Sequence, residues 1–247
     1  MTNREPMIKF FRKIRQKMIS ENKFSKYLIY AIGEVLLVVI GILIALQVNN
    51  WNNESANRDK EINLLTEMIR NLNLNINQFS NEIEKQKSII QNIDVVMSQI
   101  KNNTPYHDSL GAKYTSFAWT EEFNFANSAF ETLKTTGLDL ITSDALRENI
   151  INLFNVKYFR SYDVINKISM AEYAELSKLY IRHIEYNKQG NATINDLDKL
   201  KIDREFTNML SSRRIWKVDL VGLYEELNAE SRHLLGMIER ELIKLKK

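Results

Sequence analysis

The chain of 247 residues contains no cysteine. Disulfide bonds, thiolate metal sites and cysteine nucleophiles are therefore excluded, and so is a lipoprotein anchor, which requires a cysteine to acylate. Proline and glycine are also scarce, at 2 and 7 residues. Because these two residue types interrupt regular secondary structure, their scarcity favours long helices.

Neither sign of charge dominates, since 34 lysines and arginines oppose 31 aspartates and glutamates. The basic residues are unevenly distributed, however. Eight of them precede residue 28, against two acidic residues, and the rest of the chain is mildly acidic. A nucleic-acid-binding protein would carry a basic surface on its main domain, so we expect no nucleic-acid partner.

A long apolar run is the clearest feature of the sequence. From Leu28 to Val48, only Glu34 and Gln47 are strongly polar. A helix of about 21 residues is roughly 31 Å long, which matches a hydrocarbon core of about 30 Å. Aromatic residues flank the run, as is typical of membrane–water interfaces: Tyr27, Tyr30 and Trp51. These features predict a transmembrane helix over residues 28–50.

Two alternatives to an anchor fit the flanks of the run less well. A buried core helix would not have basic residues crowded on one side only, and a cleaved signal peptide would need a shorter positive region and a small-x-small motif. The basic N-terminal side is predicted to be cytoplasmic. The expected organisation is a cytoplasmic segment over residues 1–27, the transmembrane helix, and an extramembrane domain over residues 51–247.

The cytoplasmic segment has an amphipathic pattern. Its apolar residues fall on one helical face: Ile8, Phe11, Ile14 and Met18. Basic residues lie elsewhere around it, and we expect five of them to contact anionic lipid headgroups: Lys9, Arg12, Lys13, Arg15 and Lys17. The alternative is a basic flank without an ordered helix.

The extramembrane part begins with a heptad pattern. Apolar residues recur every seven residues at two positions between residues 62 and 100, and only Gln86 interrupts them. The stripe also widens, because Met68, Ile89 and Val96 occupy positions that a two-stranded coiled coil usually fills with charge. A wide stripe favours packing within a helical bundle, and self-association stays compatible with it.

Further helices are expected along the rest of the chain. One covers residues 120–136 and ends at Gly137 in a left-handed cap, and the next runs from a Ser143 cap to about Tyr186. After a turn at residues 187–196, the last helix is expected to bury Phe206, Met209, Trp216, Leu220, Leu223, Leu227, Leu234 and Ile238. The predicted fold class is all-α, with a single N-terminal transmembrane helix followed by an extramembrane antiparallel helical bundle with long helices.

The sequence lacks the motifs of common catalytic and metal sites. His107, His183 and His233 do not have metal-ligand spacing, and phosphate-loop and nucleophile-elbow motifs are absent. We therefore expect no enzyme, no cofactor and no metal.

Several other residues raise the question of a site but have a simpler interpretation. Three charged pairs are interpreted as solvent-exposed helix faces: Glu121 with Glu122, Glu225 with Glu226, and Arg213 with Arg214. A group of aromatic residues is expected to pack in the core rather than to line a pocket: Trp119, Phe123, Phe125 and Phe130.

Glu34 is the residue that the apolar run accommodates least well. A charge at bilayer depth costs roughly 3 kcal/mol on insertion scales, so such residues are usually paired, functional or able to reach the interface. Glu34 and Gly41 share a helical face, and Gly41 with Ala45 forms a small-xxx-small pair typical of helix contacts. We interpret Glu34, Gly41 and Ala45 as an assembly face. Proton relay and contact with the headgroups are the alternatives.

Three stretches carry a family resemblance: "IKFFRKIRQ", "NKFSKYLIYAIGEVLLVVIGILIALQVNNWNNE" and the later "SAFETLKTTGLDLITSDALRENIINLF". The first two resemble the N-terminal signature of an uncharacterised family of single-pass membrane proteins from Bacteroidota, and the third is similar to a helical segment of the same family. The resemblance implies a bacterial inner-membrane protein with a periplasmic helical domain. It implies no reaction.

The combined prediction is a membrane-anchored periplasmic helical scaffold or sensor module, without catalysis. Its expected partners are the lipid bilayer and either further copies of itself or a membrane protein. The alternative is an accessory subunit of a proton-coupled membrane machine, in which Glu34 is a titrating site.

Overall fold

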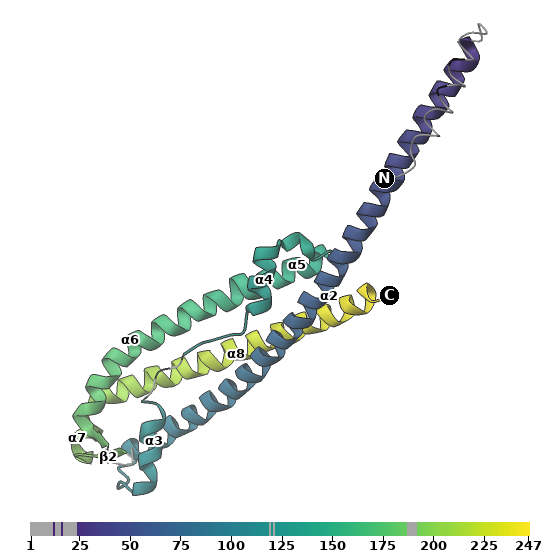
Figure 1. Cartoon of the computed structure of the whole chain (residues 1–247). Helices are drawn as coiled ribbons and strands as arrows, with labels where there is room; N and C mark the ends of the chain where they lie inside the picture. Colours follow the sequence, from purple (N-terminus) through teal and green to yellow (C-terminus); the bar gives the residue numbers. More distant parts are fainter. Residues whose placement is uncertain (1–11, 13–15, 17–23, 119, 121, 187–191) are drawn as a thin grey trace. The chain divides into compact units, whose positions relative to one another are not determined.

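The computed structural model describes residues 12, 16, 24–118, 120, 122–186 and 192–247. Figure 1 shows an all-α chain with long helices, and one two-stranded hairpin is its only sheet within these residues. The chain divides into two compact units, residues 1–59 and residues 60–247. The predicted all-α class with long helices is therefore confirmed.

The first unit contains the apolar run, which is helical as predicted. Helix α2 (Phe24–Lys101) includes the whole run, and every residue from Val35 to Asn50 is exposed. Among the described residues, α2 contains the one segment that is long and apolar enough to cross a membrane.

In the second unit, α2 contributes the predicted apolar stripe. Leu65, Leu72 and Phe79 are fully buried at one heptad position. The additional positions Met68, Ile89 and Val96 are buried as well, which confirms the widened stripe. The other heptad position, which begins at Ile62, is more exposed to solvent. Several of its residues are only half-buried: Ile62, Ile69, Ile90 and Met97.

The middle of the chain is more broken than predicted. Helix α4 (Ser128–Thr136) begins at Ser128, so the expected helix over residues 120–136 is wrong in its first half, where residues 122–127 are not helical. Gly137 has φ +114° and ψ 132°, a conformation that favours glycine but is not the predicted left-handed helical cap. Ser143 caps α5 (Asp144–Ile151) as expected, because its hydroxyl accepts from the backbone N–H of Leu146.

A π-helix (Asn152–Tyr158) connects α5 to α6 (Phe159–His183). The predicted continuation of this helix to Tyr186 is wrong. The chain instead forms β1 (Ile184–Tyr186), which pairs antiparallel with β2 (Ala192–Ile194). Pairing with a second strand satisfies the backbone groups that a longer helix would have bonded internally.

The remaining helices are α3 (Gly111–Ser116), α7 (Leu197–Ile202) and α8 (Arg204–Leu245), with short 3-10 turns η1 (Asp108–Leu110) and η2 (Leu138–Leu140). Asp203 caps α8 by accepting from two backbone N–H groups. Of the residues predicted to be buried in α8, Met209, Trp216 and Leu223 are only half-buried. The buried seam of α8 instead follows three- and four-residue steps through Phe206, Leu210, Arg213, Lys217, Leu220, Tyr224, Leu227, Ser231, Leu234 and Ile238.

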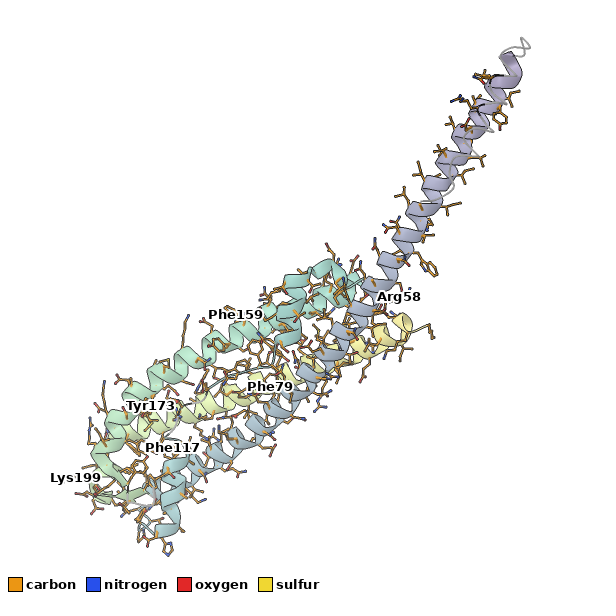
Figure 2. All side chains as sticks on the ribbon, viewed as in Figure 1. Arg58, Phe79, Phe117, Phe159, Tyr173 and Lys199 are labelled. Atoms are coloured by element: carbon orange, nitrogen blue, oxygen red, sulfur yellow. The ribbon has the colours of Figure 1, made fainter. Side chains whose placement is uncertain are left out.

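Two apolar clusters form the core of the second unit. The first lies around Phe79, whose ring is 5.6 to 6.0 Å from the rings of Phe123, Tyr158 and Tyr224. The second lies around Phe117, which packs edge to face on Tyr180 at 5.8 Å. Figure 2 labels Phe79 and Phe117, one in each cluster. Helices α2, α6 and α8 contribute to the second cluster, and α2, the π-helix, α6 and α8 to the first.

Candidate functional site

A layer of polar residues separates the two apolar clusters. Each of the helices α2, α6 and α8 contributes to the first cluster from one part of its length and to the second cluster from another part. Between these two parts, every buried residue of the helix is polar. We call these residues the polar layer: Gln86 on α2, Ser169 on α6, and Arg213 and Lys217 on α8. Fully buried lysine and arginine are rare unless they are paired, so the layer is the most unusual feature of the core.

Arg213 is the best-defined member of the polar layer. Only 2 % of it is exposed, its Nε donates to the Phe117 carbonyl at 2.6 Å, and its Nη1 donates to the Glu172 carboxylate at 2.7 Å. The prediction that Arg213 is solvent-exposed is therefore wrong. The residue occupies a seam position of α8, and these two charge-assisted bonds offset the cost of removing its guanidinium from water.

The neighbouring Arg214 differs because it lies one residue off the seam. It is partly exposed, as predicted, and pairs with Asp94 at 2.6 and 3.1 Å. The hydrogen bond with Asp94 raises the pKa of Arg214.

Two members of the polar layer, Gln86 and Ser169, leave some hydrogen-bonding capacity unused. Gln86 donates from Nε2 to Glu82 at 3.2 Å, but its Oε1 accepts no hydrogen bond from any described residue. Within the described part of the chain, Ser169 Oγ has no hydrogen-bond partner, and the indole N–H of Trp216, which lies next to the layer in the sequence of α8, donates to none. A buried polar atom without a partner costs about 1 to 3 kcal/mol, so the layer lowers stability relative to an apolar continuation of the core.

A second group of polar side chains forms hydrogen bonds with the backbone of the segment between α3 and α4 and of the start of α4. Asn75 is fully buried; its Nδ2 donates to the Ala126 carbonyl at 2.9 Å, and its Oδ1 accepts from the Ala126 N–H at 2.7 Å. Asn71 Oδ1 accepts from the Ala129 N–H at 3.0 Å, and Gln78 donates to the Asn124 carbonyl at 2.9 Å. We call these three residues, together with Asn166 of α6, the backbone clamp.

The backbone clamp explains why residues 122–127 are not helical. Asn166 accepts from the Phe123 N–H at 3.0 Å and donates to its carbonyl, so this backbone bonds to side chains instead of to itself. The clamp places Phe123 and Phe130 in the core, as predicted, and Phe125 is half-buried. Trp119, a further aromatic residue expected in the core, lies outside the described residues.

The predicted assembly face lies on α2 in the first unit. Gly41 and Ala45 are exposed, and Glu34 is half-buried. Of the predicted lipid-contacting residues, Arg12 is helical and exposed, whereas Lys9, Lys13, Arg15 and Lys17 lie outside the described residues.

The acidic pairs are exposed where they are described. Glu122, Glu225 and Glu226 are exposed, and Glu121 lies outside the described residues. Glu225 forms an ion pair with Lys87, and Glu226 with Lys157.

The three histidines lie apart and have different surroundings. His107 caps η1 and His233 is exposed, whereas His183 is buried, with Nε2 2.7 Å from Asp203 Oδ2. The hydrogen bond with His183 lowers the pKa of Asp203, and the backbone N–H groups of Phe206 and Glu205 lower it further. No group of three histidine or acidic residues able to hold a metal occurs among the residues that the structure describes.

A surface cavity of about 370 Å³ lies beside α6. Its lining combines aromatic and aliphatic residues with one serine: Ala118, Tyr173, Leu176, Ser177, Tyr180, Ile181 and Tyr186. None of these lining residues is charged, and the Ser177 hydroxyl donates to the Ala174 carbonyl of its own helix at 3.2 Å, so the lining contains no histidine or carboxylate base beside this serine.

Comparison with known proteins identifies one family. The sequence model of a family of unknown function, DUF6090, matches residues 34–169, which is more than half of the chain. No curated protein and no solved structure matches.

Proposed function

Because this chain belongs to the family of unknown function DUF6090, we propose a function from its own physical properties. The protein is a membrane-anchored helical scaffold or sensor module that performs no catalysis and assembles with itself or with a membrane partner. In a bacterium of the Bacteroidota, the anchor spans the inner membrane and the second unit lies in the periplasm.

The observation that carries the proposal is the exposed apolar surface of α2. Fourteen large aliphatic residues between Leu28 and Val48 are each 44 to 72 % exposed. Soluble monomers rarely expose apolar patches of this extent, and a bilayer covers such a surface. At roughly 0.4 kcal/mol each on insertion scales, these residues favour insertion by about 6 kcal/mol, which exceeds the roughly 3 kcal/mol cost of Glu34.

The contacts of the second unit support the antiparallel bundle of the proposal. Between α2 and α8, Lys87 pairs with Glu225 and Arg214 with Asp94, so residue numbers rise along one helix as they fall along the other. Antiparallel bundles of long helices carry many different functions, so this arrangement is compatible with a scaffold or sensor module but does not by itself determine it.

The topology is tested with reporters fused after Lys247. A reporter that is active only outside the cytoplasm is expected to be active, because the basic flank precedes the anchor. Activity of a cytoplasm-dependent reporter at the same position would instead show that the orientation is reversed.

Assembly through the predicted face is tested with Gly41→Leu, and Gly33→Leu is the matched control. A Cβ added at either glycine meets no described atom within 4 Å, so neither change disturbs its own chain. Eight residues separate them, which places them about 80° apart around the helix. Gly41→Leu is expected to reduce the size of the detergent-extracted complex, and Gly33→Leu is not. Equal sizes for both variants and wild type would contradict the assembly face.

The proton-coupled alternative predicts a different result at Glu34. An amide keeps hydrogen-bonding capacity but does not titrate, so Glu34→Gln is expected to leave an assembly intact. Loss of a growth or motility phenotype with an intact complex would favour the proton-coupled subunit over the scaffold.

A further inference from the structure

An open hollow lies on the surface where α6 begins. It has a volume of about 260 Å³, and five residues line it: Asn124, Phe125, Asn127, Phe159 and Tyr162. Three of them belong to the segment that the backbone clamp holds before α4, and the other two lie in the first turn of α6. We call this surface the α6 hollow.

Aromatic rings make up most of the α6 hollow. Phe159 is 63 % exposed and Tyr162 is 44 % exposed, and they lie three residues apart, so their side chains share one side of the helix. Phe159, at the start of α6, is labelled in Figure 2. Phe125 is half-buried, and its ring is 5.0 Å from that of the buried Tyr158. Apolar side chains scattered singly over a surface need no explanation, but aromatic residues gathered around a hollow indicate a binding surface.

The backbone of the α6 hollow is fixed before any ligand binds. The Asn124 carbonyl accepts from Gln78 Nε2 at 2.9 Å, and the N–H and carbonyl of Ala126 are both bonded by Asn75. Irregular segments that a rigid scaffold positions commonly carry binding residues. Because such a segment is already ordered, little conformational entropy is lost on binding. A binding site therefore gives a physical reason for the polar side chains that hold this segment.

The lining selects the chemistry of the ligand. None of the residues that line the hollow is charged, which disfavours phosphate, carboxylate and ammonium groups. The amides of Asn124 and Asn127 and the hydroxyl of Tyr162 supply donors and acceptors that a purely apolar ligand would leave unpaired. The matching ligand is neutral, with an apolar face for the rings and polar groups at its edge. A pyranose sugar has this form, because its C–H groups lie on the ring faces and its hydroxyl groups lie around the edge.

We propose that the α6 hollow binds one pyranose unit of a neutral saccharide. Phe159 and Tyr162 pack against its C–H groups, which the electron-rich face of an aromatic ring attracts. Asn124 bonds to its hydroxyl groups, and Asn127, whose Nδ2 donates to Glu131 Oε1 at 3.2 Å, accepts from them through its side-chain carbonyl. Drug-sized ligands occupy about 300 to 1,000 Å³, so a hollow of about 260 Å³ suits a single ring of a longer chain. Such binding goes beyond the proposed function and supplies a ligand for its sensor role.

Isothermal titration calorimetry of the full chain tests the site directly. The protein is kept in a detergent without a sugar headgroup, because a glycoside detergent would compete for the hollow. Three neutral trisaccharides serve as probes, namely cellotriose, maltotriose and tri-N-acetylchitotriose, and at least one is expected to bind saturably. Phe159→Ala and Tyr162→Ala are each expected to weaken its binding roughly tenfold, because each removes an aromatic contact. Asn124→Ala removes a hydrogen bond and is expected to weaken binding roughly fivefold.

Tyr173→Ala is the matched control. Tyr173 is 47 % exposed and lies on the same helix but does not line the hollow, and Figure 2 labels it together with Phe159. Its substitution is expected to leave the affinity unchanged. Phe159→Tyr keeps the aromatic ring and is expected to retain binding. All altered residues are exposed, and unchanged circular dichroism verifies that each variant is folded.

Co-sedimentation distinguishes the two sources of such a sugar ring. If the full chain pellets with isolated peptidoglycan and the trisaccharide releases it, the source is a cell-wall glycan. If the chain binds the trisaccharide but stays in the supernatant, the source is a free saccharide.

Three results would overturn the proposal. The first is that none of the three trisaccharides binds. The second is that Tyr173→Ala weakens binding and Phe159→Ala does not, which would place the saccharide in the cavity beside α6 instead. The third is that adenosine binds and the saccharides do not, which would indicate stacking of a flat base. The proposed function is tested apart from these results, because Gly41→Leu reports on the size of the complex and not on sugar binding.

Discussion

Asn75→Ala is the substitution whose effect follows most directly from the structure. Asn75 is fully buried, and its amide forms both hydrogen bonds of the Ala126 peptide groups, at 2.9 and 2.7 Å. Alanine removes both bonds and leaves a backbone donor and acceptor to find other partners. At about 1 to 1.5 kcal/mol for each net hydrogen bond, we expect the free energy of unfolding to fall by about 2 to 3 kcal/mol.

Gln78→Ala is the matched control, because Gln78 makes a single bond to the same segment from an exposed position. It is expected to cost less than about 1 kcal/mol. Asn75→Asp gives a further comparison: the carboxylate still accepts from the Ala126 N–H but cannot donate to the carbonyl, and it introduces a buried charge. We expect Asn75→Asp to be at least as destabilising as Asn75→Ala.

Denaturant unfolding of the full chain in detergent, followed by far-ultraviolet circular dichroism, measures these differences. The result that would refute the reasoning is an Asn75→Ala free energy within 0.5 kcal/mol, roughly the additivity error, of that of Gln78→Ala. In that case the non-helical conformation of residues 122–127 would have a cause other than the backbone clamp.

Three further predictions concern the polar layer and the α6–α8 junction. Gln86→Leu is expected to raise the free energy of unfolding by about 1 kcal/mol, because it removes a buried side-chain carbonyl that accepts no hydrogen bond from a described residue. A lower free energy of unfolding in the same denaturation assay would contradict this prediction. Arg213→Met is expected to lower the free energy of unfolding by about 2 to 3 kcal/mol, since the ion pair with the half-buried Glu172 is lost, and an unchanged midpoint argues against that ion pair. Folding lowers the pKa of Asp203. The ionised carboxylate therefore contributes to stability at pH values above its pKa in the unfolded chain, which is about 4, and this contribution is lost as the pH falls. Wild type is therefore expected to lose more stability than Asp203→Asn between pH 5 and 2, and equal losses in pH-dependent melting contradict the assignment.

The sequence by itself determined the features that depend on local periodicity. The apolar run is helical and exposed, the heptad stripe of α2 is buried and widened at Met68, Ile89 and Val96, and Ser143 caps α5. These properties follow from the spacing of neighbouring side chains and from hydrogen bonds within a few residues, so they can be derived without knowing what packs on the helix.

Only the tertiary structure decided which polar residues are buried. Arg213 was expected in solvent because arginine usually is, yet its partner at the Phe117 carbonyl is 96 residues away in sequence. The first half of the predicted helix over residues 120–136 failed for the same reason, since Asn75 lies 51 residues from the backbone it binds. The free energy of such contacts depends on chain segments that only folding brings together, and no local pattern encodes their proximity.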